Sequence, residues 1–533
     1  MTAIAEKTEH PALGQFNSSL MWRDAIEQGE GTFDYLNSTI FPMPGAPCSV
    51  AAMAPHTAVV GSTGSGKTIL LKHLMRSVLS ADISEGGLRF RAVVYDPKRE
   101  LFPFLRMMGI PASQIVVTHP FDARSACWDL AADFREPAQI EELAELIVPK
   151  SENPGESESA LFFETSSRII VQDVIESLHE TQPGSWDLRA VIETLMNQDS
   201  LKECLQRTAN GRDTWNAYFR PRELDPSDRT SNSLVATLHA YARPFQALAS
   251  LWYNTDHKFS LDRWHVGSGV LLLGADPRRE RTMQRINRLL IRRISQLVLG
   301  RDEERPIDLT WFFFDEIREA GKLRGLRQLM TEGRSKGARV VMGFQDIEGL
   351  YSLYGDHEAE EMVGLCGNRM ILHVDNPKTR KWASDFMGEA EVPDESFSEG
   401  ETAGRDRSVS TGRQVSLTLR ANVLPVEFHS MPLGNPFTGV PIWFSVPGRR
   451  NFAQLSPQEA QEAVFLDQQI DERAIVPRPE DEQKRIENQS FNDLPDETMP
   501  AAESPPSEAS GKPILLGSLS EFLSDVLESD ERE

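Results

Sequence analysis

The stretch VVGSTGSGKT (residues 59–68) indicates the class of fold, because four residues separate Gly61 from Gly66 and Lys67-Thr68 follow at once. This spacing is that of a phosphate-binding loop, in which glycines allow main-chain amides to wrap the phosphates of a nucleotide. Lys67 is expected to reach the β- and γ-phosphates, and the Thr68 hydroxyl to ligate Mg²⁺. The predicted loop contacts to ATP come from Gly61, Ser62, Thr63, Gly64, Ser65, Gly66, Lys67 and Thr68.

Short apolar runs, each ended by a polar or turn residue, recur between helical stretches. Such runs are typical of the buried strands of a parallel sheet, whose ligands bind at the carboxyl ends of the strands. The sequence therefore predicts an α/β fold with a mostly parallel sheet. The runs are TAVVG (57–61), FRAVVYDP (90–97), QIVVTHP (114–120), GVLLLGADP (269–277), TWFFFDE (310–316), RVVMGFQD (339–346), RMILHVDNP (369–377) and VPIWFSVP (440–447).

The run TWFFFDE ends in two acids that suit nucleotide hydrolysis. Asp315 is expected to bind the nucleotide's Mg²⁺ through water, and Glu316 to polarise the attacking water. A polar residue at the end of a neighbouring strand, Gln345, could sense the γ-phosphate, or it is an ordinary strand-end amide. Arg334, just before that strand, could complete the site of a neighbouring subunit, or it forms an ordinary surface salt bridge.

The strand pattern stops between residues 135 and 262, where apolar residues recur at three- and four-residue spacing. We expect a helical domain there, inserted into the α/β domain. After residue 450 the chain is rich in Pro, Glu, Gln and Ser, which predicts disorder up to a terminal acidic amphipathic helix. The expected divisions are an N-terminal segment (1–50), the α/β domain in two parts (51–134 and 263–450), the helical insertion (135–262) and the tail (451–533).

Composition limits the class of protein. The net charge is −24, but residues 451–533 hold 20 acidic and 6 basic side chains, so the acidity is concentrated in the tail and does not exclude a basic channel elsewhere. The four cysteines are far apart, which predicts buried thiols and neither a zinc site nor a disulfide framework. No run of about 20 apolar residues is present, so we expect a cytoplasmic protein, peripheral at a membrane at most.

Two basic stretches are candidate contacts to DNA. Arg281, Arg285, Arg288 and Arg292 form one stripe of an expected helix. DNA phosphate, acidic residues of the next subunit and plain solvent each remain as partners of this stripe. In DNPKTRKW (375–382), Lys378, Arg380 and Lys381 with Trp382 could combine charge and base stacking, or this is a capped helix start.

Several motifs in the same order resemble the type IV secretion coupling proteins of the TraD/TrwB kind. They are the phosphate loop, VVYDPKRELFPFL (93–105), FFFDE (312–316), GRSKGARVVMGFQDIEGL (333–350), CGNRMILHVDNPKTRKWASDFMG (366–388) and ANVLPVEFHSMPLG (421–434). The resemblance implies a RecA-like, Mg²⁺-dependent ATPase with an inserted all-α domain that forms a hexameric ring on DNA. It also implies a relaxase, a relaxosome or a secreted protein as substrate, and the components of a secretion channel as partners.

Family roles fall on residues that match. Lys67 and Thr68 lie in the nucleotide loop, Asp315 and Glu316 match the Mg²⁺ and water acids, Gln345 the strand-end glutamine, and Arg334 the inter-subunit arginine. Asp96 and Lys98 match the second strand's motif, to which no duty is assigned. Family members usually begin with membrane helices, which this sequence does not predict, so a separate anchor protein and a truly soluble relative are both expectations.

Three functions follow from these patterns. The first is an ATP-driven motor that delivers DNA or a nucleoprotein to a type IV secretion or conjugation channel. The second is a soluble FtsK/HerA-like DNA translocase, and the third is a nucleotide-gated adaptor that recruits protein effectors. Stimulation of hydrolysis by DNA would separate the motors from the adaptor.

Overall fold

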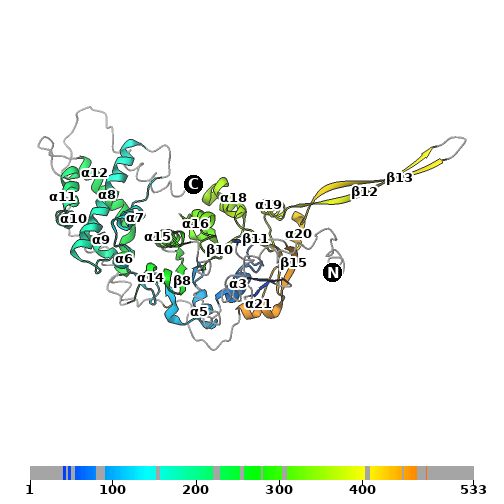
Figure 1. Ribbon diagram of the computed structural model, residues 1–533, viewed down its shortest axis with the longest axis horizontal. Coiled ribbons are helices and arrows are strands. Elements are labelled where there is room, and N and C mark those ends of the chain that lie inside the picture. Colours follow the sequence, from blue (N-terminus) through cyan, green and yellow to red (C-terminus); the bar gives the residue numbers. More distant parts are fainter. Residues whose placement is uncertain are drawn as a thin grey trace, which may run out of the picture. The chain divides into compact units, whose positions relative to one another are not determined.

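The computed structural model describes residues 40–43, 46–49, 55–79, 91–151, 157–219, 229–252, 257–277, 280–302, 309–323, 325–402, 408–446, 449–464 and 476. The chain divides into two compact units. The first comprises Met1–Leu88, Trp311–Arg318 and Met330–Gln469, and the second Arg89–Thr310, Glu319–Leu329 and Ile470–Glu533. Figure 1 shows the elements of both.

The first unit carries the phosphate loop on a sheet with the strand order β15-β14-β11-β3-β10-β9. The central strands β10 and β11 both run parallel to β3, and β14 and β15 add an antiparallel edge. The predicted α/β fold with a mostly parallel sheet is thereby confirmed. The strands are β3 (Thr57–Val60), β9 (Thr310–Phe314), β10 (Ala338–Phe344), β11 (Asn368–Ile371), β14 (Val440–Val446) and β15 (Arg449–Leu455).

The strands of this unit form because they are apolar on both faces. Every residue of β3 and β9 is buried, so their Val and Phe side chains leave water on both sides of the sheet. The helices that accompany them are α3 (Lys67–Leu79), α16 (Leu326–Glu332), α17 (Ile347–Tyr354), α18 (Asp356–Gly364), α19 (Pro377–Met387), α20 (Pro425–Ser430) and α21 (Pro457–Val464). The short pair β1 (Ile40–Met43) and β2 (Ala46–Ser49) is antiparallel.

The folded chain extends past residue 450, where the sequence analysis expected the disordered tail to begin. Strand β15 pairs with β14, and the Phe452 ring meets Trp443 edge-on with centroids 5.3 Å apart. Ala460 and Ala463 of α21 are buried, and α21 contacts α3. A few apolar residues at alternating and helical spacing are enough to order this stretch, because both elements cover an existing core. The expected terminal helix lies outside the described residues.

The second unit carries parallel strands in the order β4-β8-β5. They are β4 (Arg91–Asp96), β8 (Gly269–Gly274) and β5 (Ile115–Val117), and all three coincide with predicted runs. Helix α5 (Leu101–Met107) follows β4, and the long helix α15 (Glu280–Leu299) follows β8. The short 3₁₀ helices η2 (Ala112–Gln114) and η5 (Ile317–Ala320) complete the connections.

Helices dominate the segment between β5 and β8, as the sequence predicts. They are α6 (Leu130–Asp133), α7 (Pro137–Ile147), α8 (Glu158–Thr181), α9 (Leu188–Met196), α10 (Gln198–Leu205), α11 (Ala209–Tyr218), α12 (Arg229–Ala242), η3 (Arg243–Phe245), α13 (Gln246–Leu251) and α14 (Leu261–Val266). A two-residue parallel pair, β6 (Cys127–Trp128) with β7 (Lys258–Phe259), brings the entry and the exit of this helical segment side by side.

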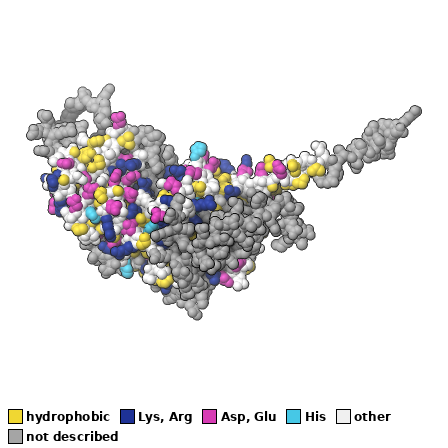
Figure 2. Space-filling model, in the orientation of Figure 1, with side chains coloured by type: hydrophobic (Ala, Val, Ile, Leu, Met, Phe, Trp, Pro, Cys, Tyr) yellow, Lys and Arg dark blue, Asp and Glu magenta, His cyan; other side chains and the backbone are white. Residues whose placement is uncertain are grey.

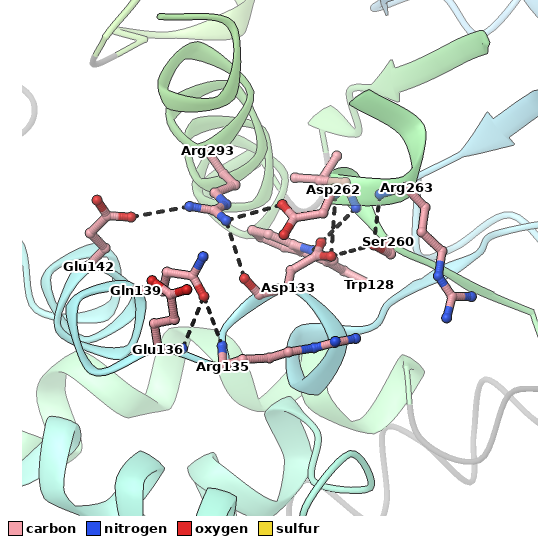
Figure 3. A network of polar contacts seen from close by, with 11 residues as sticks. Trp128, Asp133, Arg135, Glu136, Gln139, Glu142, Ser260, Asp262, Arg263 and Arg293 are labelled. Carbon is pink, nitrogen blue, oxygen red and sulfur yellow. Dashed lines mark hydrogen bonds and ion pairs between the residues drawn. The ribbon is translucent and has the colours of Figure 1, made fainter. Parts of the chain in front are cut away.

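A buried polar network fixes this entry and exit (Figure 3). The Asp133 carboxylate accepts hydrogen bonds from the Trp128 indole (2.6 Å), the Ser260 hydroxyl and the Leu261 amide (2.6 Å). Burial raises the pKa of Asp133, and hydrogen bonds from Ser260, Trp128 and Leu261 oppose that effect. The buried Arg293 guanidinium donates to Glu142, to Asp262 and to the Asp133 carbonyl, so α15 joins the same network.

A long antiparallel hairpin was not predicted from the sequence. Strands β12 (Glu389–Thr402) and β13 (Ser408–Ala421) pair along their whole length, and the hairpin extends away from α19 and α20 in Figure 1. Hydrophobic side chains are visible on its described part in Figure 2. The alternation of Val415, Leu417 and Leu419 with polar residues was the signal for β13, and polar β12 gave none.

The cysteines and the membrane-spanning potential, both considered from composition, can be compared with the described residues. Cys127, Cys204 and Cys366 are buried free thiols, and burial raises the pKa of Cys127 and Cys366 to about 12. Among the helices in the described ranges, none combines the length and the apolar character needed to span a bilayer.

Candidate nucleotide site

The loop 61–66 leaves β3 at its carboxyl end and leads directly into α3. Neighbouring strands hold it from both sides, because the Gly61 amide donates to the Phe344 carbonyl (3.3 Å) and the Ser62 amide to the His373 carbonyl (2.8 Å). A third bond, from the Ser65 amide to the Ser62 carbonyl (3.1 Å), closes the turn. The loop is therefore fixed by the ends of β10 and β11.

Two glycines of the loop have positive φ angles, 77° at Gly64 and 95° at Gly66. A Cβ at Gly66 would lie 2.8 Å from a methyl group of Val440, so only glycine fits where the loop passes β14. A Cβ at Gly64 would meet nothing within 4 Å. The loop thus packs tightly on one side and opens to the outside on the other.

Lys67 and Glu316 form a buried ion pair at the start of α3. The Lys67 Nζ lies 2.9 Å from Glu316 Oε2, and both residues are largely buried. Burial strips water from both charges, so each depends on the other for compensation. The lysine predicted to bind phosphate and the acid predicted to orient water therefore contact each other directly.

Thr68 and Asp315 form the second contact across the same gap. The Thr68 hydroxyl donates to Asp315 Oδ2 at 2.8 Å. A hydroxyl and a carboxylate side by side are oxygen ligands of the kind that Mg²⁺ takes in nucleotide sites. The structure thus brings together the four residues Lys67, Thr68, Asp315 and Glu316, which the sequence places in two distant stretches.

The loop also offers unused hydrogen-bond donors. The amides of Gly64, Gly66 and Lys67 donate to no other described residue, and the buried Ser65 hydroxyl has no partner among them. Because the first amides of a helix and its dipole favour anions, these donors fit a nucleotide's phosphates. The residues present therefore fit both Mg²⁺ and a phosphate chain.

Gln345 and Arg334 lie at opposite ends of β10. The exposed Gln345 follows the strand and accepts a hydrogen bond from the Thr63 hydroxyl (3.0 Å), so it belongs to the loop site. Arg334 precedes the strand, is exposed, and forms no ion pair with a described residue. Since β10 (Ala338–Phe344) rises about 3.3 Å per residue, Arg334 lies roughly 20 Å from the loop's edge of the sheet.

The arginine stripe of α15 meets partners within its own chain. Arg292 pairs with Glu145 of α7 (3.1 Å), and the Arg285 guanidinium lies over the Phe245 ring (5.7 Å). An acid of the same chain is a partner that the sequence analysis did not consider. The side chain of Arg281 lies outside the described residues, and Arg288 is half-buried.

The second basic stretch begins α19. Asn376 caps this helix by accepting the amides of Lys378 and Thr379, and Lys378 pairs with Glu348 (2.5 Å). The Trp382 ring stacks on Phe386 with centroids 4.7 Å apart. The capped helix start is therefore present, while Arg380 is half-buried and Lys381 is exposed.

Asp96, for which the sequence predicted no role, holds the start of a helix. In the second unit, its carboxylate accepts the amides of Glu100 (3.1 Å) and Leu101 (2.8 Å), so it caps α5. Arg99 has a φ of 57° and pairs with Asp276 (3.1 Å). Lys98 is exposed.

Comparison with known proteins identifies the family. The family model for the type IV secretion-system coupling protein DNA-binding domain matches residues 41–441. Because this match covers most of the chain, the protein belongs to that family. No curated protein matches the sequence.

Solved structures of the plasmid coupling protein TrwB share the fold. An unbound form of TrwB aligns with a TM-score of 0.60 and 20% identity, covering 86% of this chain and 94% of that chain. TrwB in complex with ADP and Mg²⁺ aligns with a TM-score of 0.59 and 20% identity over the same shares. TrwB in complex with a non-hydrolysable ATP analogue aligns with a TM-score of 0.59 and 20% identity, covering 87% and 95%.

Proposed function

We propose that this chain is an ATP-hydrolysing motor of the coupling type, which acts on DNA and delivers it, or a nucleoprotein, to a type IV secretion channel. The observation that carries the proposal is the paired arrangement of Lys67 with Glu316 and of Thr68 with Asp315 beneath an open phosphate loop. Membership of the coupling-protein family and the ADP- and Mg²⁺-bound form of its structural relative TrwB support ATP and Mg²⁺ as the ligands.

In this proposal the Lys67–Glu316 pair is exchanged when nucleotide binds. Lys67 turns from Glu316 Oε2 to the terminal phosphates, while the amides of Gly64 and Gly66 donate to the phosphate chain. Glu316, released from the lysine, orients a water for attack, and Gln345 is close enough to the loop to report the γ-phosphate. Mg²⁺, held by Thr68 and by Asp315 through water, would neutralise charge on the phosphate oxygens.

A second subunit would complete the site. Arg334 cannot reach the loop of its own chain, because the length of β10 separates the two. Its exposure, without an ion pair among the described residues, supports a role at the nucleotide of a neighbour in a hexameric ring. Such an arginine typically contributes about 10³–10⁵ in rate.

DNA would pass along basic side chains of the ring. Among the predicted contacts, Lys381 is exposed, whereas Lys378 and Arg292 are engaged with Glu348 and Glu145. Arg281, Arg285, Arg288 and Arg380 remain candidates. A relaxase or secreted protein as cargo, the channel components and a separate membrane anchor protein stay proposals of the same kind.

Hydrolysis measured with and without DNA tests this function. Glu316→Gln should keep ATP binding and lower kcat by about 10²–10⁴-fold, because the water loses its orienting base. Lys67→Ala should lose binding as well, and Glu360→Gln on the exposed face of α18 serves as the control. If neither single- nor double-stranded DNA changes the wild-type rate of hydrolysis, the motor proposal is rejected in favour of the nucleotide-gated adaptor.

A further inference from the structure

Three side chains beside the phosphate loop form a cluster with no role in the proposed hydrolysis. His373 and Asp375 follow β11, and His429 lies in α20. One nitrogen of each ring and one oxygen of the carboxylate all lie within 4.8 Å of one another. Both stretches carry family motifs, but neither motif predicts a function for these three residues.

The distances within the cluster are close to those between the ligands of one ion. His373 Nε2 lies 2.9 Å and His429 Nδ1 3.7 Å from Asp375 Oδ1. Ligand atoms placed about 2.0–2.2 Å from a tetrahedral zinc ion are roughly 3.3–3.6 Å apart. The two observed separations bracket this value, so small shifts of the exposed Asp375 and His429 side chains would place all three ligand atoms around one centre.

The hydrogen bonds of His373 call for a positive charge at this point. Its Nδ1 lies 2.7 Å from the Met431 carbonyl oxygen, while its Nε2 faces the Asp375 oxygen. Both partners are acceptors, and a neutral imidazole has a single N–H to donate. If Nδ1–H donates to Met431, the Nε2 lone pair points at a carboxylate oxygen, and a cation between them resolves the conflict.

The surroundings also resemble those of a metal site. Histidine ligands usually donate their other N–H to a backbone carbonyl, as His373 can to Met431. The side chains of Asp375 and His429 are 62% and 54% exposed, which gives an ion an entry path and a water for its fourth position. Two imidazoles and one carboxylate favour Zn²⁺ over Mg²⁺ or Ca²⁺, which prefer oxygen ligands.

We propose that His373 Nε2, His429 Nδ1 and Asp375 Oδ1 bind one zinc ion that fastens α20 to the phosphate loop. The loop is reached directly, because the Asp375 amide donates to the Ser62 hydroxyl (2.8 Å) and the Ser62 amide to the His373 carbonyl (2.8 Å). Zinc would hold these residues in the geometry that the loop needs, and so tune nucleotide affinity. The ion takes no part in hydrolysis.

Zinc titration of the full-length, untagged protein tests the site, after chelator treatment and without nucleotide. Wild type should bind one equivalent, and Co²⁺ in its place should give the intense visible absorption of a tetrahedral site. His429→Ala and Asp375→Ala should each weaken binding by more than the roughly 10–100-fold that loss of an outer partner costs. His357→Ala, an exposed histidine of α18, should bind like wild type.

Further measurements separate this site from the nucleotide site and from a folding defect. Lys67→Ala should keep its zinc, and circular dichroism should show that each variant folds, since the replaced ligands are exposed. The proposal is overturned if wild type binds no stoichiometric zinc, or if His429→Ala binds it as wild type does. It is equally overturned if the His373 ring simply carries a second proton near neutral pH, seen by NMR, and zinc does not displace that proton.

Discussion

At the level of single residues, the candidate site contains charges that compensate each other, and in the proposed function phosphate replaces one of these partners. Lys67 and Glu316 are buried together, and Thr68 already contacts Asp315. The sequence predicted that these four residues share one site, because a phosphate loop and an acidic strand end meet at the same edge of a parallel sheet. It did not predict the direct Lys67–Glu316 contact, which depends on how β9 and α3 are placed.

His56 is a second residue for which the sequence did not predict burial. The ring is buried before β3, where Nδ1 accepts the Val340 amide (3.1 Å) and Nε2 donates to the Met330 carbonyl (2.8 Å). Burial, as the largest cause, lowers its pKa to about 4. The folded state therefore keeps this ring neutral where the unfolded chain would protonate it.

Stability should consequently fall as the pH is lowered from about 6.5 towards 4. The unfolded state binds the extra proton in this window, so the free energy of unfolding decreases with acidity, by at most about 3 kcal/mol for this group. Urea unfolding of wild type and His56→Gln at pH 7.5 and pH 5 measures the effect. His119, whose pKa burial also lowers to about 4, adds the same trend in both proteins. Equal pH dependence of the two proteins would refute the assignment to His56.

At the element scale, the helical insertion depends on one buried carboxylate. Asp133 joins the ends of the insertion by accepting hydrogen bonds from Trp128, Ser260 and Leu261 (Figure 3). Helical periodicity predicted the insertion, but a single Asp gave no sign that it would be buried. Its partners come from both ends of the helical segment, so the pairing exists only in three dimensions.

Asp133→Ala should lower the free energy of unfolding by about 3 kcal/mol or more, because several buried donors would lose their acceptor. Asp129→Ala is a matched control, since it removes a helix cap that accepts the Ala132 amide and typically costs about 1 kcal/mol. Urea unfolding followed by tryptophan fluorescence compares the two, with Trp128 inside the network. A loss in Asp133→Ala no larger than in the control would contradict the role of the network.

The hairpin β12–β13 should tolerate changes that the sheet does not. Leu417 and Leu419 are 67% and 65% exposed, although both are large and apolar. Leu417→Ala with Leu419→Ala should change the free energy of unfolding by less than about 1 kcal/mol. Ile442→Ala, at a buried position of β14, should lose about 2–5 kcal/mol in the same assay. A comparable loss in both proteins would mean that the hairpin packs against further parts of the fold.

At the scale of the whole molecule, the proposed ring makes a prediction that no single chain can. Glu316→Gln subunits lack the acid proposed to orient water but keep Arg334, whereas Arg334→Ala subunits keep Glu316 and lack the arginine. Mixed in one ring, the two should restore hydrolysis where an Arg334 of the first faces a Glu316 of the second. ATPase rates across mixing ratios, with DNA present, should exceed the sum of the separate rates.

Two controls make the mixing experiment decisive. Lys67→Ala mixed with Glu316→Gln should show no recovery. Lys67 and Glu316 come from the same subunit, so every site in a mixed ring still lacks one of the two. Sedimentation should show that the mixed proteins assemble as wild type does. If mixed rings form but hydrolysis does not recover, Arg334 either acts within its own chain or has no role in catalysis.

Sequence patterns were enough to predict the class of fold, the phosphate loop, the acidic strand end and the helical insertion. These features are local: glycine spacing, apolar periodicity and strand-end chemistry act over a few neighbouring residues. Four features became visible only in the folded chain: the Lys67–Glu316 pair, the Asp133 network, the partner of Arg292 and the His373–Asp375–His429 cluster. Each of these joins residues far apart in the chain, and their contact depends on the packing of strands and helices, which no local pattern encodes.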